Sequence, residues 1–279
     1  MLFACGLFWS SAGVLIELVH WHAIAIWSTR SAIAAIALYA IRPMSFRGIT
    51  RAEIAAACAL AATTGLFVIA NKLTTAANAI LIQYSAPIWV ALLGQWFLGE
   101  RASRLDWLTI VVVLGGIALF FFDKLTTDHV AGNLVALAAG VAFAFGAMTM
   151  RKAALDAKVD PLRPLFLGNV LGAVAGLPWL FATPWPDATG WAALVALGVV
   201  QQAAAYLCYA AAIRHAKAIE VILIPIIEPI LSPLWVMLVF GERPGPWALA
   251  GGAIVVGAVT LRAVLSRRAP PAHTSAGAP

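Results

Sequence analysis

Charged residues are scarce in this chain. Only 11% of its 279 residues are Asp, Glu, Lys or Arg, whereas 63% are apolar. Soluble domains carry about 25% charged and about 45–50% apolar residues, and a soluble chain of this length has too little interior to bury so much apolar surface. The composition therefore excludes a soluble globular protein and predicts an all-α integral membrane protein.

Motifs for cofactors and catalysis are also missing. The three cysteines lie in apolar runs without a CxxC pair, which argues against a disulfide framework. The five histidines lie at helix ends, in loops or near the C-terminus, which argues against a buried metal or haem site. The chain has no GxxxxGK[ST] motif and no Ser/His or Asp/Asp pair at membrane depth. We expect no cofactor, no metal, no ATP and no enzymatic activity.

Ten apolar runs account for most of the chain. A membrane-spanning helix needs about 20 apolar residues, and the breaks between the runs carry the Pro, Gly and charged residues typical of loops. The runs cover residues 1–19, 22–41, 54–71, 76–98, 105–122, 131–150, 163–182, 190–213, 218–240 and 246–265. We predict ten transmembrane helices.

Basic residues are distributed unevenly over the predicted loops. With the N-terminus in the cytoplasm, fourteen Lys and Arg fall in cytoplasmic segments and three in outer segments, and Arg30 is left inside a helix. The positive-inside rule thus predicts that both termini are cytoplasmic. It also explains the net charge of +6 without a nucleic-acid partner. Residues 267–279, rich in Pro, Ala, Ser and Gly, predict a disordered cytoplasmic tail.

Two segments of the chain repeat each other at a spacing of 142 residues. Residues 70–101 and 212–243 align without a gap and share eleven identities, including Pro87 with Pro229 and one Gly-Glu-Arg motif per copy. A weaker similarity links Gly6-Leu7-Phe8-Trp9 with Gly140-Val141-Ala142-Phe143. Five helices per copy is an odd number, so the second copy must insert upside down, as in many transporters. We predict one five-helix repeat over residues 1–124 and a second, inverted repeat over residues 125–266.

The Ala-x-x-x-x-x-Ala lead-in, the mid-helix Pro and the terminal Gly-Glu-Arg, once per half, resemble those of the EamA-type transporters of the drug/metabolite transporter superfamily. In overall texture the chain is most similar to the bacterial aromatic amino-acid exporters, which also tolerate methyl viologen. It departs from them in starting directly within its first helix.

This resemblance implies a secondary transporter of the bacterial inner membrane. Its expected substrates are amino acids, aromatic or other neutral ones, or similar small amphiphilic metabolites, which it exports by alternating access. The resemblance also implies a cavity lined by the first, third, fourth, sixth, eighth and ninth helices. The expected partners are the small-molecule substrate and the lipid bilayer, and a monomer suffices because two repeats complete a pathway.

Two other hypotheses stay open at this point. Within the same class, the substrate is a cationic drug such as methyl viologen or another small metabolite. From a different class, the chain is a membrane enzyme or a channel. Saturable exchange across a vesicle membrane distinguishes a transporter from both.

Prolines predict broken helices at matching places in the two copies. They are Pro87 in the first copy and Pro225, Pro229 and Pro233 in the second. Each removes a backbone hydrogen bond and frees a carbonyl, which must find a partner or line a wet cavity. Such interruptions mark transporter sites, although any one proline can equally be a packing kink. The alignment of Pro87 with Pro229 favours the first interpretation.

Polar and aromatic side chains near these breaks are the predicted substrate-binding residues. They are Trp9, Asn78, Gln83, Tyr84, Trp89, Gln202, Tyr206 and Glu228. Aromatic walls suit a substrate with a ring or an ammonium group. The alternative for the tryptophans is lipid-facing or packed bulk, and for Gln202 and Tyr206 it is hydrogen bonding between helices.

Four ionisable residues are candidates for ion coupling or salt bridges: Glu17, Arg30, Glu220 and Glu228. A carboxylate at mid-membrane costs about 2.5–3.5 kcal/mol, so Glu228 is predicted to couple protons, to bind an amine, or to be a neutral acid bonded to a freed carbonyl. Glu17 and Arg30 predict a structural salt bridge, with binding of a substrate carboxylate as the alternative role of Arg30. Glu220 aligns with Asn78 in the repeat.

Overall fold

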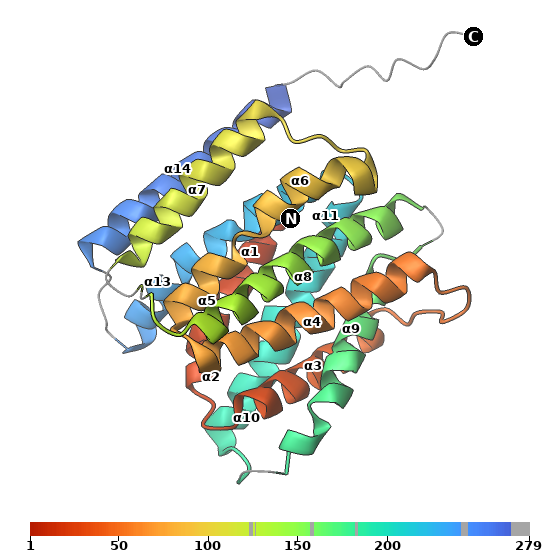
Figure 1. Ribbon diagram of the computed structural model, residues 1–279. Coiled ribbons are helices and arrows are strands. Elements are labelled where there is room, and N and C mark those ends of the chain that lie inside the picture. Colours follow the sequence, from red (N-terminus) through yellow and green to blue (C-terminus); the bar gives the residue numbers. More distant parts are fainter. Residues whose placement is uncertain (123–124, 126, 157–158, 182–183, 241–244, 269–279) are drawn as a thin grey trace.

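The computed structural model describes residues 1–122, 125, 127–156, 159–181, 184–240 and 245–268. In these ranges every assigned element is a helix, and each of the ten apolar runs coincides with one or more of them (Figure 1). The second Gly-Glu-Arg motif, 241–243, lies outside the described residues. So does the predicted tail from residue 269 onward, whereas residues 267 and 268 belong to the last helix rather than to the tail.

The helices of the first half are α1 (Leu2–Ser10), α2 (Ala12–Glu17), α3 (Ala23–Ile41), α4 (Arg51–Leu73), α5 (Ala76–Gln83), α6 (Ala86–Leu98) and α7 (Arg104–Phe120). Those of the second half are α8 (Val130–Leu155), α9 (Leu162–Ala175), the 3₁₀ turn η2 (Leu177–Trp179), α10 (Ala188–Ala196), the π-helix η3 (Leu197–Ala204), α11 (Ala205–Ile213), α12 (Ala218–Leu223), the 3₁₀ turn η4 (Ile224–Ile227), α13 (Glu228–Phe240) and α14 (Pro246–Arg268).

Six helical stretches are long and apolar enough to cross a membrane. They are Ala23–Ile41, Arg51–Ala70, Asn78–Leu98, Val130–Leu155, Ala188–Ile213 and Pro246–Leu265. Large apolar side chains such as Trp96, Ile36 and Val111 are exposed on the outside of the molecule. An apolar exterior of this extent is expected of helices that face lipid. The chain is therefore a membrane protein, as its composition predicts.

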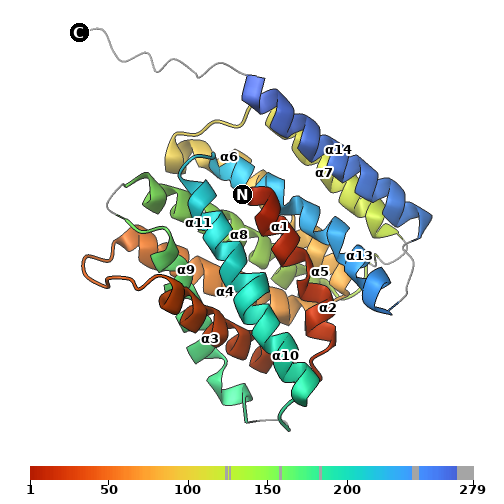
Figure 2. The same ribbon diagram turned by 180° about the vertical axis from the view of Figure 1, so that it is seen from behind.

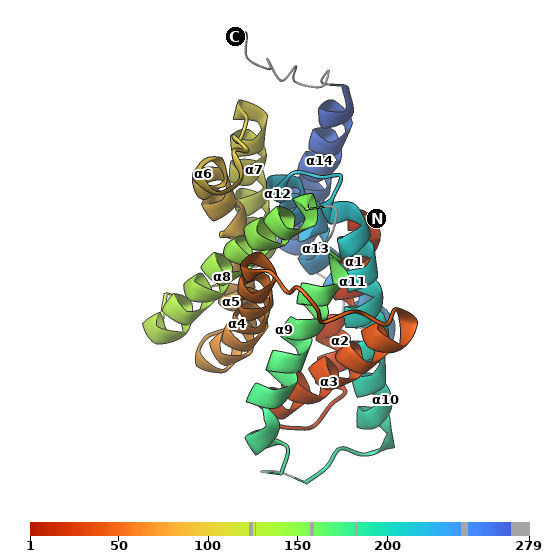
Figure 3. The same cartoon turned by 90° about the vertical axis from the view of Figure 1, so that its right-hand side faces the viewer.

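The long helices α4 and α8 lie side by side through the middle of the molecule (Figure 1). On one side of them, α9 packs against both α3 and α4. Seen from behind, α1 runs beside α11 and α13 (Figure 2). The pair α7 and α14 occupies one edge, and α3, α9 and α10 occupy the opposite edge (Figure 3).

Glycine allows α7 and α14 to approach closely. A Cβ on Gly116 of α7 would lie 2.8 Å from Val255 Cγ2 and 3.2 Å from the carbonyl oxygen of Gly251, both on α14. Contacts of this closeness need small residues, which are the usual means of packing helices in membranes. The pair thus combines close backbone approach at these glycines with packing of apolar side chains such as Ile117 and Val255.

Helix boundaries follow the same 142-residue spacing as the sequence repeat. The helices α5 and α12 begin at Ala76 and Ala218, and α6 and α13 begin at Ala86 and Glu228. Farther along, α6 and α13 end at Leu98 and Phe240, and α7 and α14 begin at Arg104 and Pro246. The spacing therefore holds for backbone structure as well as for residue identity.

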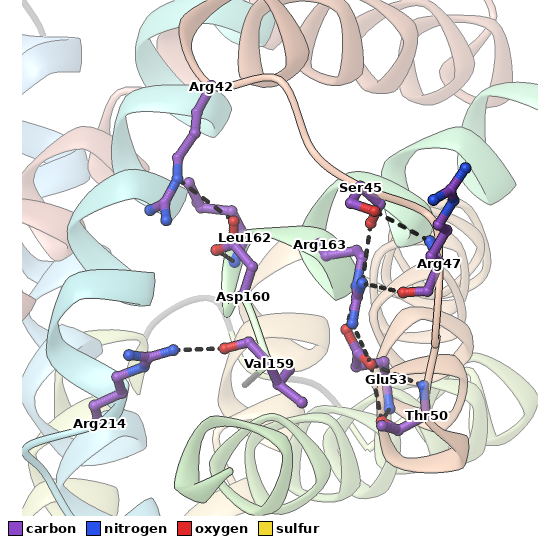
Figure 4. Close-up of polar contacts among 10 residues, drawn as sticks. All are labelled: Arg42, Ser45, Arg47, Thr50, Glu53, Val159, Asp160, Leu162, Arg163 and Arg214. Atoms are coloured by element: carbon purple, nitrogen blue, oxygen red, sulfur yellow. Dashed lines mark hydrogen bonds and ion pairs between the residues drawn. The ribbon is translucent and has the colours of Figure 1, made fainter. Parts of the chain in front are cut away.

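A buried arginine ties three segments together at the end of the molecule where α4 begins (Figure 4). Arg163 on α9 donates from Nη2 to Glu53 Oε2 (2.8 Å) and from Nη1 to the carbonyls of Ser45 (2.9 Å) and Arg47 (3.1 Å). Glu53 also completes a capping box with Thr50 at the start of α4. One guanidinium therefore fixes the α3–α4 connection to α9.

The start of α7 is built in the same way. Asp106 forms a capping box with Ser103, and Arg262 on α14 donates to Asp106 Oδ1 from Nε at 2.8 Å. Charge-assisted bonds of this kind are stronger than neutral ones. In both places an acid at a helix N-terminus binds an arginine from a distant helix.

We predict that Arg163→Ala destabilises the protein strongly. Glu53 is 0% exposed, and removing its cation leaves a buried charge without compensation, which costs about 3–5 kcal/mol. Arg42→Ala is the matched control, because its pair with Asp160 (3.4 Å) is exposed and is worth about 0–1 kcal/mol. Thermal unfolding of the purified protein in detergent measures both; equal losses would contradict a special role for the Arg163 contact.

Candidate functional site

A cavity of about 590 Å³ lies between the helices of the two halves. All six segments that the resemblance assigns to a cavity lining contribute residues to it, namely those containing α1, α4, α5, α8, α11 and α13. The resemblance assigns neither α3 nor α9 to the lining, yet α3 contributes Ile26, Trp27 and Arg30, and α9 contributes Leu165. The size lies within the range of small-molecule sites, about 300–1,000 Å³.

Buried polar atoms without a partner are concentrated in this cavity. Within the part of the chain that the structure describes, four buried side-chain atoms have no hydrogen-bond partner: Trp21 Nε1, Arg30 Nε, Gln201 Oε1 and Gln202 Oε1. All four residues line the cavity. Folded proteins satisfy nearly all buried polar groups. A group of exceptions around one cavity therefore marks a place where a bound molecule can supply the missing bonds.

Both predicted helix breaks reach the cavity. In the first half, α5 ends at Gln83 and α6 begins at Ala86, with Pro87 buried in the first turn. In the second half, the 3₁₀ turn Ile224–Ile227 separates α12 from α13 and contains Pro225. A proline in the first turn of a helix leaves no intrahelical bond unmade. The prolines thus lie where each helix restarts.

Pro229 lies in the first turn of α13 and lines the cavity. Pro233 lies farther along α13, and its side chain is outside the described part. The prolines of the second half are therefore not equivalent in the structure. Of the two whose side chains the structure describes, Pro229 lines the cavity and Pro225 does not.

One hydrogen bond joins the two breaks. Tyr84, in the turn between α5 and α6, donates from its hydroxyl to Glu228 Oε2 at 3.0 Å, and Glu228 is the first residue of α13. Both residues line the cavity, as does Gln83 one position earlier. This bond connects the halves of the chain at the place where each has an interrupted helix.

Two glycines allow a helix from each half of the chain to pack against the helix break of the other half. A Cβ on Gly140 of α8 would lie 2.9 Å from the carbonyl oxygen of Gln83, and a Cβ on Gly6 of α1 would lie 3.2 Å from Cα of Pro225. Gln83 and Pro225 are 142 residues apart. Thus α8 of the second half packs on the break of the first half, and α1 of the first half packs on the break of the second.

Aromatic rings form much of the cavity wall. Trp9 contacts Tyr206 edge-on, with ring centroids 6.3 Å apart, and Tyr209 in a tilted arrangement at 6.1 Å. Trp27 donates from Nε1 to Thr64 Oγ1 at 2.9 Å, which fixes a further ring between α3 and α4. Rings held by such contacts present flat apolar faces, suited to stacking with a ring or covering an alkyl group.

Gln202 and Tyr206 line the cavity and also connect helices. Gln202 Nε2 donates to Asn169 Oδ1 on α9 at 2.5 Å, and it lies 3.4 Å from the hydroxyl of Tyr206. Gln201 and Gln202 are on the π-helix η3, a form often found at functional sites. Hydrogen bonding between helices is thus shown for Gln202, whereas substrate binding by Gln202 and Tyr206 stays a prediction that their place in the cavity lining allows.

Three predicted residues lie away from the cavity. Asn78 donates from Nδ2 to Asn133 Oδ1 at 3.1 Å, and Trp89 donates from Nε1 to Ser85 Oγ at 3.3 Å. Glu220 accepts from Arg262 Nη1 at 3.2 Å and from the backbone of Lys217. Asn78 and Trp89, predicted to bind substrate, are thus not among the lining residues. Glu220, predicted as a coupling or salt-bridge residue, forms an ion pair with Arg262.

The predicted pair of Glu17 with Arg30 stays a prediction, because the side chain of Glu17 lies outside the described part. Arg30 is buried and lines the cavity. It lies within electrostatic range of Glu228. The ion pairs formed by the described side chains do not include Arg30.

Several lining residues were not among the predicted site residues. They are Trp21, Trp27, Thr63, Thr64, Phe143, Gln201 and Tyr209. The adjacent Thr63 and Thr64 and the adjacent Gln201 and Gln202 are polar pairs within apolar runs, a signal that was present in the sequence. Phe143 aligns with Trp9 in the weaker repeat, which is the signal for its position.

Glu100 of the first Gly-Glu-Arg motif has a structural role. Its carboxylate accepts from Arg151 Nε on α8 at 3.0 Å and from the backbone amide of Ala218 at 2.9 Å. These bonds hold the end of α6 against α8 and the start of α12. Glu100 therefore bonds both a backbone amide and an arginine close to the loop that follows α6.

We predict that Gly140→Ala destabilises the protein by about 1–3 kcal/mol, the usual cost of overpacking, because its Cβ would press on the carbonyl of Gln83. Gly115→Ala in α7 is the matched control, since nothing lies within 4 Å of its Cβ, and alanine is favoured over glycine inside a helix by about 0.5–1 kcal/mol. Opposite shifts in the unfolding temperature are expected. Equal shifts in the two variants would mean that the helix break at Gln83 accommodates a Cβ on Gly140.

Known proteins similar to this chain are transporters. The profile of the EamA-like transporter family matches residues 1–122 and 130–263. An uncharacterized transporter of Archaeoglobus fulgidus is 26% identical over 199 residues, 71% of each chain. The pseudopaline exporter CntI of Pseudomonas aeruginosa is 28% identical over 186 residues, 64% of this chain and 63% of its own length.

The fold also matches a known one. A crystal structure with 21% sequence identity superposes with a TM-score of 0.79 over 96% of both chains. At that identity the match concerns the fold alone, whereas the family profile covers nearly all of the sequence. This chain belongs to the EamA-like transporter family.

Proposed function

We propose that the chain is a secondary transporter that exports amino acids, aromatic or other neutral ones, or similar small amphiphilic metabolites across the bacterial inner membrane. Its ten membrane-spanning helices form two inverted five-helix repeats, residues 1–124 and 125–266. Shared helix boundaries at a spacing of 142 residues support the repeat. The reciprocal packing of Gly6 and Gly140 on the opposite breaks supports a two-fold relation between the halves.

The observation that carries the proposal is the cavity at the junction of the two broken helices. It combines aromatic walls, a carboxylate, a guanidinium and buried polar atoms that lack partners. Inverted-repeat transporters place the substrate between their halves at such interrupted helices. An amphiphilic molecule with a polar end and an apolar body complements this lining better than a simple ion or a wholly apolar compound does.

Alternating access requires one end of the cavity to open as the other closes. The lining reaches Val19, Trp21 and Ala23 at the connection between α2 and α3. At the opposite end of α3, the Arg163–Glu53 bond draws α9 to α4. In the proposed orientation, with both termini cytoplasmic, the end at which Arg163 binds Glu53 is the cytoplasmic end. The cycle then consists of opening the cavity at the cytoplasmic end while the outer end closes.

The direction of transport is proposed from two observations. The resemblance implies an exporter, and the relative CntI is named as an exporter. The partners in this proposal are the substrate and the lipid bilayer, without ATP. A second candidate substrate class is a cationic compound, which the carboxylate of Glu228 in the cavity favours.

Counterflow in proteoliposomes tests the proposal. Vesicles are loaded with unlabelled amino acid, and labelled phenylalanine, threonine or methyl viologen is supplied outside, with protein-free vesicles as the control. We expect saturable accumulation of an amino acid. Accumulation of methyl viologen alone would favour the cationic class, flux that does not saturate would indicate a channel, and chemical conversion would indicate an enzyme.

Glu228→Gln tests proton coupling in the same assay. Glu228 accepts the Tyr84 hydrogen bond, and Cys5 and Arg30 are further ionisable groups close to it. If this carboxylate carries the proton, the variant should transport at a rate that no longer depends on an imposed pH gradient. Tyr84→Phe keeps the carboxylate and should keep the pH dependence. An unchanged pH profile in Glu228→Gln would exclude it from coupling.

A further inference from the structure

Arg30 differs from the other deeply buried arginines. Arg163 and Arg262 each donate two N–H groups to a carboxylate, Glu53 and Asp106 respectively. Arg30 is equally buried, at 8% exposure, but its Nε has no hydrogen-bond partner and no carboxylate pairs with it among the described side chains. A charged side chain inside a membrane normally faces a partner or a wet cavity. Here it faces the cavity.

The carboxylate inside the same cavity does not fill this role. Glu228 Oε2 accepts the hydroxyl of Tyr84 at 3.0 Å. It influences Arg30 electrostatically without forming an ion pair with it. The cavity thus holds one guanidinium that forms no ion pair with the described side chains and whose Nε has no hydrogen-bond partner among them. Tyr206, which also lines the cavity, is close enough to influence Arg30 electrostatically.

We propose that Arg30 binds a carboxylate of the transported molecule, so that the substrates of this chain are carboxylic acids with an apolar or aromatic body, amino acids included. A guanidinium presents a rigid pair of donors that matches both oxygens of a carboxylate. The aromatic wall formed by Trp9 and Tyr206 covers the body of the molecule. This inference rests on the proposed transport function, and it names the end of the substrate that is recognised.

Three compounds with one ring system test it. Phenylalanine has a carboxylate and an ammonium group, 3-phenylpropionate only the carboxylate, and phenethylamine only the ammonium group. Each is measured in counterflow and by its effect on the unfolding temperature of the protein in detergent. We expect the wild type to recognise the two carboxylates, and Arg30→Gln to weaken their binding at least about tenfold, since hydrogen bonds to charged groups contribute about 1.5–3 kcal/mol.

The pattern across compounds separates recognition from folding. Arg30→Gln should not weaken any response to phenethylamine, because it removes a charge of the same sign as the ligand's. Arg30→Lys should restore carboxylate binding only in part, because an ammonium group lacks the paired donors. Arg42→Gln is the matched control, as an exposed arginine outside the cavity. An equal loss for all three compounds would overturn the inference. So would a Glu17→Gln variant that reproduces every effect, since Arg30 would then serve the ion pair expected from sequence.

The two proposals fail separately. If the wild type transports phenethylamine and shows no response to either carboxylate, transport stands and the role of Arg30 falls. If the carboxylates stabilise the wild type through Arg30 but none of the compounds crosses the membrane, the binding role stands and the export proposal falls. A wild type that responds to no carboxylate in either assay overturns the inference about Arg30.

Discussion

A bilayer offers the protein backbone no hydrogen-bond partners, so every interruption of a membrane helix must be covered by protein or open onto a wet cavity. Two interruptions, at residues 84–85 and 224–227, lie within the aligned segments of the two sequence copies. Each is covered on one side by a helix that can come close because it presents a glycine, Gly140 or Gly6. On the other side, Gln83 and Tyr84 at the first break and Glu228 directly after the second line the same cavity. The position of the cavity is therefore a consequence of where the helices break.

The same constraint separates two kinds of buried charge. At the helix N-termini, Glu53 and Asp106 satisfy backbone amides and bind Arg163 and Arg262, so each charge is compensated within the protein. Such contacts hold segments together and are expensive to break. Arg30 has no such partner among the described side chains. In our proposal its charge is compensated by a carboxylate of the bound molecule, which would distinguish this binding group from the two structural arginines.

Local patterns in the sequence predict much of this arrangement. Apolar runs place the helices, prolines place the breaks, and Gln83, Tyr84 and Glu228 stand out as polar groups beside them. The direction in which a polar side chain points is a different matter. Asn78 and Glu220 lie on the predicted segments, yet they face Asn133 and Arg262, partners that are at least 42 residues away in sequence. Trp27 was not predicted as a lining residue, because a tryptophan in an apolar run is equally expected to face lipid. Its hydrogen bond to Thr64 on the next helix shows that it faces the protein instead.

The repeat also explains why the two halves contribute different side chains to the site although their helix boundaries match. Helix boundaries and the prolines 87 and 229 are shared between the copies, whereas Tyr84 corresponds to Ile226 and Glu228 to Ala86. Both chemical groups of the bridging hydrogen bond are thus present once, in different halves, and they meet only when the halves are assembled. In the proposed alternating-access cycle, a substrate held between them would contact side chains that move apart when the halves move. Recognition would then be coupled to access, because the repeated backbone would supply the movement and the residues that are not repeated would supply the chemistry.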